Sequence, residues 1–156
     1  MNRVWILVAS LCTSLAVHGA TVEEGLYGSW KVDAAVDSQD TASISSDDVD
    51  RLTGKQLLIT SKLVQFDDET CEKPQFKTSR KRTARMFRQD YRFSPKYTGL
   101  PDPVVEVKVS CANPVDYFIY LKNKSTIVFY WKGFFLSAVR QQATKPSHPM
   151  TDFGRP

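Results

Sequence analysis

Paired carboxylates are the residues of this chain that could carry out acid–base chemistry. Asp47 precedes Asp48, and Asp67 precedes Asp68 and Glu69. Two neighbouring carboxyl groups can act as general acid and general base when their surroundings separate their pKa values. Both pairs lie in polar stretches, where solvated carboxylates are the more common case. We therefore expect a protein without catalytic residues and rank an enzyme below other functions.

Sulfur and imidazole groups are scarce in this chain. Of three cysteines and two histidines, Cys12 and His18 lie in the first 20 residues, which leaves Cys71, Cys111 and His148. A single histidine offers little for a metal site or for a nucleophile–histidine pair, so we expect neither metal nor cofactor. Two lone cysteines in an oxidising compartment most often pair. We predict a Cys71–Cys111 disulfide that closes a loop of about 40 residues.

Basic residues gather in the middle of the chain, whose formal net charge is +4. Four of them recur at helical spacing across a predicted helix over residues 83–91: Lys81, Arg85, Arg88 and Arg92. On an adjacent face, Ala84, Phe87 and Tyr91 would anchor this helix. A basic face is most often only solvated, but it also suits an acidic partner. We list these four residues as candidates for partner binding.

The N-terminus has the pattern of a secretory signal peptide. Asn2 and Arg3 form a short charged region, an apolar run from Val4 to Val17 follows, and Gly19 and Ala20 are small enough for cleavage. We expect residues 1–20 to be removed and the mature protein to be periplasmic or secreted, without a transmembrane segment. Nucleic acid is an unexpected partner outside the cytoplasm.

Alternating apolar residues and turn signals predict a mainly β domain over residues 21–140. The expected eight strands cover residues 27–36, 56–60, 63–66, 75–79, 104–111, 117–121, 126–131 and 134–140. Short helices are predicted at 46–53 and 83–91, and the proline-containing tail 141–156 is predicted to be disordered. Short connections late in the chain indicate an antiparallel meander, and up-and-down barrels and sandwiches are the two candidate architectures. Its strands are aromatic on both faces, so one face forms the core and other chain segments, or a ligand, cover the second.

Three short motifs resemble those of the lipocalins. Gly28-Ser29-Trp30 is similar to their Gly-x-Trp motif, Asp116-Tyr117 to part of their Thr-Asp-Tyr motif, and Arg140 to the arginine that packs over the tryptophan. The resemblance implies an antiparallel eight-stranded barrel closed by Gly28, Trp30 and Arg140. A guanidinium stacked on an indole would cap that end by cation–π attraction. The two inserted helices and the tail depart from the family pattern.

Two functions follow as expectations. The first is non-enzymatic binding of a small apolar molecule or lipid, which the lipocalin resemblance and the abundance of aromatic residues favour. The second is a protein-binding inhibitor or immunity-type factor that acts on a secreted or cell-wall hydrolase. A rigid secreted scaffold with separated acidic and basic regions favours this alternative, whose partner would be an acidic protein surface.

Overall fold

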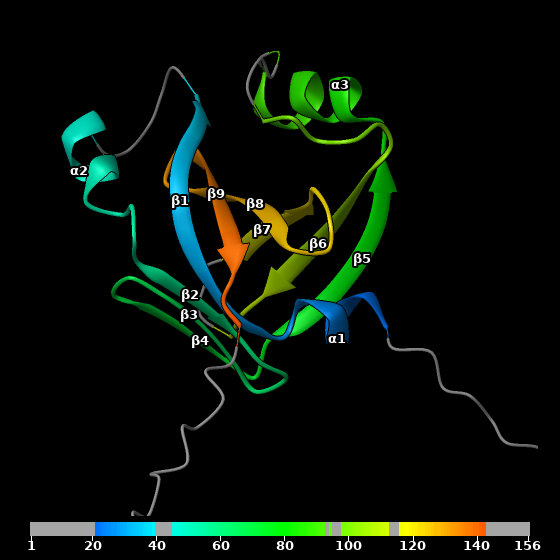
Figure 1. The fold of residues 1–156 in the computed structure, drawn as a ribbon. Coiled ribbons are helices and arrows are strands. Elements are labelled where there is room, and N and C mark those ends of the chain that lie inside the picture. Colours follow the sequence, from blue (N-terminus) through cyan, green and yellow to red (C-terminus); the bar gives the residue numbers. More distant parts are fainter. Residues whose placement is uncertain (1–20, 40–44, 93, 95–97, 113–115, 143–156) are drawn as a thin grey trace, which may run out of the picture.

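The computed structural model describes residues 21–39, 45–92, 94, 98–112 and 116–142. The predicted signal peptide, His148 and the tail beyond residue 142 lie outside these residues. The described chain is a curled antiparallel sheet with short helices at its margins (Figure 1). No helix among the described residues has the length and apolar character needed to cross a membrane.

Nine strands form one sheet in the described part of the chain. Their order in the sheet is β4-β3-β2-β1-β9-β8-β7-β6-β5, so nearly every strand lies beside its neighbour in sequence. Their bounds are β1 Gly28–Ser38, β2 Gln56–Ile59, β3 Leu63–Phe66, β4 Glu69–Glu72, β5 Gln75–Lys81, β6 Val104–Ser110, β7 Asp116–Leu121, β8 Thr126–Trp131 and β9 Phe134–Arg140.

The first and last strands join the two halves of this meander. β1 pairs with β9 from Trp30–Arg140 to Ser38–Phe134, with two register shifts along β1. β4 and β5 form the two edges of the sheet. A disulfide links the β4 edge to the strand next to the opposite edge, because Cys71 in β4 is bonded to Cys111 just after β6, with their Cα atoms 5.3 Å apart. The expected cysteine pair thus ties the margins of the curled sheet together.

Both faces of the sheet are covered by other parts of the chain. In β7, Ile119 belongs to a large core with residues of β1–β4, whereas the next residue, Tyr120, belongs to a second cluster with Met86 and Phe87. Successive side chains of a strand point to opposite faces. The expectation of aromatic residues on both faces, with one face covered by other chain segments, is therefore confirmed. We call these clusters the large core and the small core.

Three short helical segments flank the sheet, and each begins with identifiable chemistry. α1 (Val22–Leu26) carries a capping box between Thr21 and Glu24. α2 (Ser46–Asp50) is capped by the Ser45 hydroxyl. α3 (Thr83–Met86) continues directly into a π-helical turn, η1 (Phe87–Tyr91). In Figure 1, α3 follows the upper end of β5, and α1 lies near the opposite end of that strand.

The prediction of eight strands is wrong for the described residues, which form nine. The acidic run interpreted as a turn contains only a two-residue turn at Asp67 and Asp68, and Glu69 already pairs with Phe66 in the β3–β4 ladder. Asp67 has a positive φ of 54°, a conformation that aspartate tolerates better than most residues. This geometry lets the chain reverse sharply enough to add β4. α1 was also missed, because its sequence is short and polar.

Candidate functional site

The three residues expected to close the barrel lie together. The guanidinium carbon of Arg140 lies 4.1 Å from the centre of the Trp30 ring. Its nitrogens donate hydrogen bonds to the carbonyl oxygens of Tyr27 and Gly25. The Trp30 indole, 1% exposed, donates to the Leu26 carbonyl oxygen at 2.9 Å. Arg140 thus closes this end of the barrel and supplies hydrogen-bond donors to the backbone carbonyl oxygens that precede β1.

Gly28 allows this close approach in two ways. Its φ of +138° lies in a region that other residues rarely adopt. A Cβ atom at this position would lie 3.0 Å from an Arg140 guanidinium nitrogen. These contacts join the end of β9 to β1 and to the backbone of α1, as expected of a structural motif.

The carboxylate pairs have structural partners at the surface. Asp48 accepts a hydrogen bond from the Ser45 hydroxyl at 2.8 Å, and this contact lowers the pKa of the Asp48 carboxyl. Asp67 pairs with Lys55, and Asp68 lies 3.9 Å from the Lys132 ammonium. These interactions cap a helix and join turns. No group of three or more potential metal-ligating side chains occurs among the described residues.

The four predicted partner-binding residues do not share one helical face. Only Arg85 and Arg88 lie in the helical segment, and both are exposed. Lys81 is the last residue of β5, and Arg92 ends η1 in a left-handed conformation with φ 60°. The helical segment spans the predicted residues 83–91, but the expectation of a single basic face was wrong because Lys81 and Arg92 lie just outside that segment.

The helix begins at Thr83 because the loop that contains Pro101 and Asp102 caps it. The carboxylate of Asp102 accepts a hydrogen bond from the Thr83 backbone at 2.9 Å, and the Thr83 hydroxyl donates to the Pro101 carbonyl oxygen. Phe87 and Tyr91 pack in or against the small core as expected, but Ala84 is exposed, and Met86 takes the anchoring role.

Lys81 instead connects a buried acid to an exposed one. Its ammonium lies 2.9 Å from the carboxylate of Glu106 and 3.1 Å from that of Asp90. Burial disfavours the charge of Lys81, but the hydrogen bonds to the two carboxylates outweigh it, so the pKa of Lys81 is raised. Glu106 is only 5% exposed, although its alternation in β6 suggests a solvated face.

Two tyrosines extend this polar cluster into the small core. Tyr120 lies opposite Glu106 in the β6–β7 ladder and forms a hydrogen bond to it. The hydroxyl groups of Tyr91 and Tyr120 share another hydrogen bond. Burial raises the pKa of both phenols, and the nearby charge of Glu106 raises it further. This cluster could have been found in the sequence only by assigning the β6–β7 register, which pairs Glu106 with the aromatic residue Tyr120 on the covered face.

Two hollows flank the ion pair between Lys81 and Asp90. One, the aromatic hollow, has a volume of about 460 Å³ and is lined by Gln39, Lys81, Asp90, Tyr91, Phe118 and Tyr130. The other, the basic hollow, has a volume of about 390 Å³ and is lined by Arg80, Lys81, Arg82, Arg85, Met86, Gln89 and Asp90. Because both hollows include Lys81 and Asp90, this ion pair separates them.

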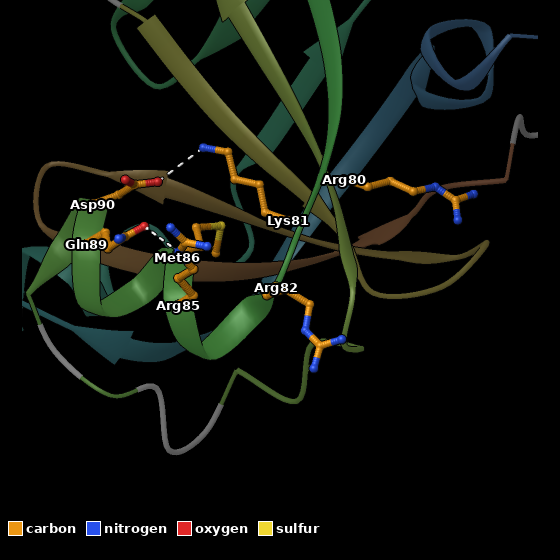
Figure 2. Close-up of a pocket in the computed structure, with 7 residues that line it drawn as sticks. All are labelled: Arg80, Lys81, Arg82, Arg85, Met86, Gln89 and Asp90. Carbon is orange, nitrogen blue, oxygen red and sulfur yellow. Dashed lines mark hydrogen bonds and ion pairs between the residues drawn. The ribbon is translucent and has the colours of Figure 1, made fainter.

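Figure 2 shows the basic hollow between the end of β5 and the helical segment. Lys81 reaches toward Asp90, and Arg85 contacts the amide of Gln89 at 3.2 Å. Arg80 and Arg82 extend outward from the strand end, and Arg82 lies 3.5 Å from Asp102. No known protein family, curated protein or solved structure matches this chain.

The predicted and observed sites overlap only in part. Lys81 and Arg85 line the basic hollow, whereas Arg88 lines a separate shallow hollow with Thr98 and Leu100. Gln39 and Tyr130, from opposite ends of the sequence, were missed. They meet because the Gln39 backbone donates to the Gly133 carbonyl at 2.8 Å, which brings the end of β1 beside the β8–β9 turn. Only the β1–β9 pairing could have revealed this proximity.

Proposed function

We propose that this protein is a non-enzymatic, secreted or periplasmic lipocalin-like binding protein for a small apolar molecule or lipid. The ligand occupies the aromatic hollow at the surface of the small core. The observation that carries this proposal is the set of three aromatic rings, Tyr91, Phe118 and Tyr130, that remain partly exposed around one hollow.

These rings differ from the rest of the face on which they lie. Phe87, Val128 and Phe135 of the small core are completely buried. Tyr91, Phe118 and Tyr130, in contrast, line a hollow of about 460 Å³. That volume lies in the range of small-molecule sites, which are largely apolar with a few polar groups. Gln39, Lys81 and Asp90 supply such polar groups here. Burying the rings under an apolar ligand would be favourable.

The large core offers little room for a ligand. Its central side chains, including Leu57, Phe66, Ile119 and Phe129, have no exposed surface. Phe66 packs edge-on against both Phe129 and Trp131, with ring centres 4.9 Å apart in each pair. Side chains fill the space that a ligand occupies in a deep calyx. We therefore place the ligand outside the large core, in the aromatic hollow beside Asp90 and Tyr91 of η1.

A neutral fluorescent probe tests this proposal. N-phenylnaphthylamine should bind and become brighter in an apolar site, and Phe118→Ser should weaken its binding because one ring of the hollow is lost. Val22→Ser is the matched control, because Val22 is 39% exposed in α1, away from the hollow. Equal loss of binding in both variants, or no binding by the native protein, would contradict the proposal. Mass spectrometry of an organic extract of native protein would then identify the natural ligand.

The filled large core also favours a second function, a protein-binding inhibitor or immunity-type factor. Arg85 and Arg88 are exposed and would attract an acidic hydrolase surface, mainly by raising the association rate. Capture of such a hydrolase at low salt should fall sharply in an Arg85→Glu/Arg88→Glu variant. Lys62→Glu/Lys124→Glu, with the same change in charge at exposed sites elsewhere, should retain capture. Unchanged capture by the arginine variant would rule out this surface.

A further inference from the structure

The basic hollow and the aromatic hollow adjoin, and we call the two together the amphipathic groove. They meet at the Lys81–Asp90 ion pair, which lines both. One side of this pair presents aromatic rings, and the other presents basic side chains beside the thioether of Met86. A ligand that spans the pair would therefore have an apolar part and a polar part of defined charge.

The charges of the basic hollow identify the charge of that polar part. Four cationic residues line this hollow, namely Arg80, Lys81, Arg82 and Arg85, together with one carboxylate, that of Asp90. Arg82 is partly neutralised by Asp102. The partner of Arg85 is the neutral amide of Gln89, which does not offset its charge. The hollow thus favours an anion.

The Lys81–Asp90 pair is suited to exchange partners. Lys81 is also held by the buried carboxylate of Glu106 at 2.9 Å, so its ammonium stays in place if Asp90 moves away. The Asp90 side chain is 45% exposed and lies in the short η1 turn. An exposed ion pair contributes little to stability, because water screens its charges. An incoming anion can therefore replace Asp90 at Lys81 at small cost.

We propose that the ligand is an amphipathic anion, whose apolar part lies in the aromatic hollow and whose acidic group replaces Asp90 on Lys81, within reach of Arg85. The chemistry is that of a fatty acid or of another lipid with an acidic headgroup. This inference rests on the proposed binding function and adds the class of ligand. Guanidinium and ammonium groups bind carboxylate, sulfonate and phosphate oxygens through charge-assisted hydrogen bonds.

Two probes with the same ring system separate charge from apolar character. Anilinonaphthalene sulfonate differs from N-phenylnaphthylamine by a single sulfonate group. The native protein should bind the sulfonate about tenfold more tightly, which corresponds to roughly one charge-assisted hydrogen bond. The double variant Arg80→Gln/Arg85→Gln should lose most of the preference for the sulfonate probe and should bind the neutral probe as tightly as the native protein does. Lys62→Gln/Lys124→Gln removes the same charge from exposed sites elsewhere and should retain the preference.

Each outcome distinguishes this inference from the function on which it rests. Equal affinity for the two probes would overturn the anionic class and leave apolar binding intact. Failure of both probes to bind would overturn the binding function and this inference with it. Inorganic phosphate serves as a competitor without an apolar part, and displacement of the sulfonate probe by phosphate at matched concentration would assign the site to free anions instead. Weak competition by phosphate and strong competition by dodecanoate would support the proposal.

Discussion

The two faces of the sheet differ in the polar groups that they bury. The large core is almost wholly apolar, and its end is closed by Arg140, whose hydrogen bonds go to backbone carbonyl oxygens. The small core contains Glu106 and approaches the surface through two tyrosine hydroxyls and an ion pair. Both faces pack aromatic rings, and on the second face three partly exposed rings, Tyr91, Phe118 and Tyr130, line one hollow together with Lys81 and Asp90.

This difference separates what the fold needs from what a ligand would use. A buried acid with its ion-pair partner contributes little net stability compared with apolar side chains of similar size. The large core shows that this chain can fill a face with apolar groups. The polar cluster of Lys81, Glu106, Tyr91 and Tyr120 is therefore consistent with the proposed binding function. The following predictions compare the two faces.

Removing the disulfide should have the largest effect, because it joins the margins of the sheet around the large core. Cys71→Ser/Cys111→Ser should lower the free energy of unfolding by about 4 kcal/mol in the chain-entropy model for a loop of about 40 residues. Chemical denaturation of both proteins measures this difference. If the variant remains folded, probe binding at the groove should persist. A loss below about 1 kcal/mol would show that strand packing alone holds these margins.

Truncation of Arg140 should have the next largest effect. Arg140→Ala removes the stacking on Trp30 and leaves carbonyl oxygens without a donor, at a cost of about 1–3 kcal/mol. Arg140→Lys keeps the charge without the planar fork and should recover only part of this loss. Arg80→Ala, an exposed arginine in β5, should change stability by no more than about 0.5 kcal/mol. Equal effects at the two arginines would remove the special role of the closed end.

A pair of tyrosine substitutions compares the two faces directly. Tyr120→Phe deletes a hydroxyl that bonds Tyr91 and Glu106 and should cost about 1–2 kcal/mol. Tyr117 lies in the large core, where its buried hydroxyl has no hydrogen-bond partner among the described residues. Tyr117→Phe should therefore be neutral or slightly stabilising. Thermal unfolding measures both, and a costly Tyr117→Phe together with a neutral Tyr120→Phe would reverse the comparison.

The smallest expected effect is a loss of stability that appears only in alkaline solution. Burial raises the pKa of Tyr91 and Tyr120, and that of Tyr117 to about 12. Because the folded pKa values exceed the unfolded value of 10, the folded state holds more protons above pH 10. The stability that depends on neutral phenols is therefore complete below pH 10 and falls as pH rises beyond it.

Tyrosine absorbance followed during an alkaline titration tests this expectation. Four phenols have pKa values that burial raises and should stay neutral above pH 10 until the protein unfolds, as monitored in parallel by circular dichroism: those of Tyr91, Tyr117, Tyr120 and Tyr130. The variants Tyr117→Phe and Tyr120→Phe should each remove one delayed phenol. Full ionisation near pH 10 in a folded protein would show that these side chains are open to water.

The sequence predicted the strands well because alternation and turn residues are local signals. β3, β8 and β9 begin and end where expected, and Trp30 and Arg140 meet because their motif spans the closing pair of strands. The groove was predicted poorly because it depends on contacts between distant segments. Gln39 and Tyr130 hydrogen-bond across most of the domain, and no local pattern encodes that approach. The burial of Glu106 is likewise not encoded locally, because alternation gives the face of a strand and not what covers that face.

The pairing of β1 with β9 also has a consequence for how this chain folds. Every other strand pairing joins neighbours in sequence and can form early within the two segments β1–β4 and β5–β9. Docking β1 on β9 joins the two ends of the domain and carries the largest loop-closure entropy. Val32→Ala, at this junction, should slow refolding more than Ile59→Ala in the β2–β3 hairpin, when each rate is compared with the loss of stability. Stopped-flow refolding measures the two rates. If the ratio of the change in folding barrier to the loss of stability is equal for the two variants, the docking of β1 on β9 is not the rate-limiting step.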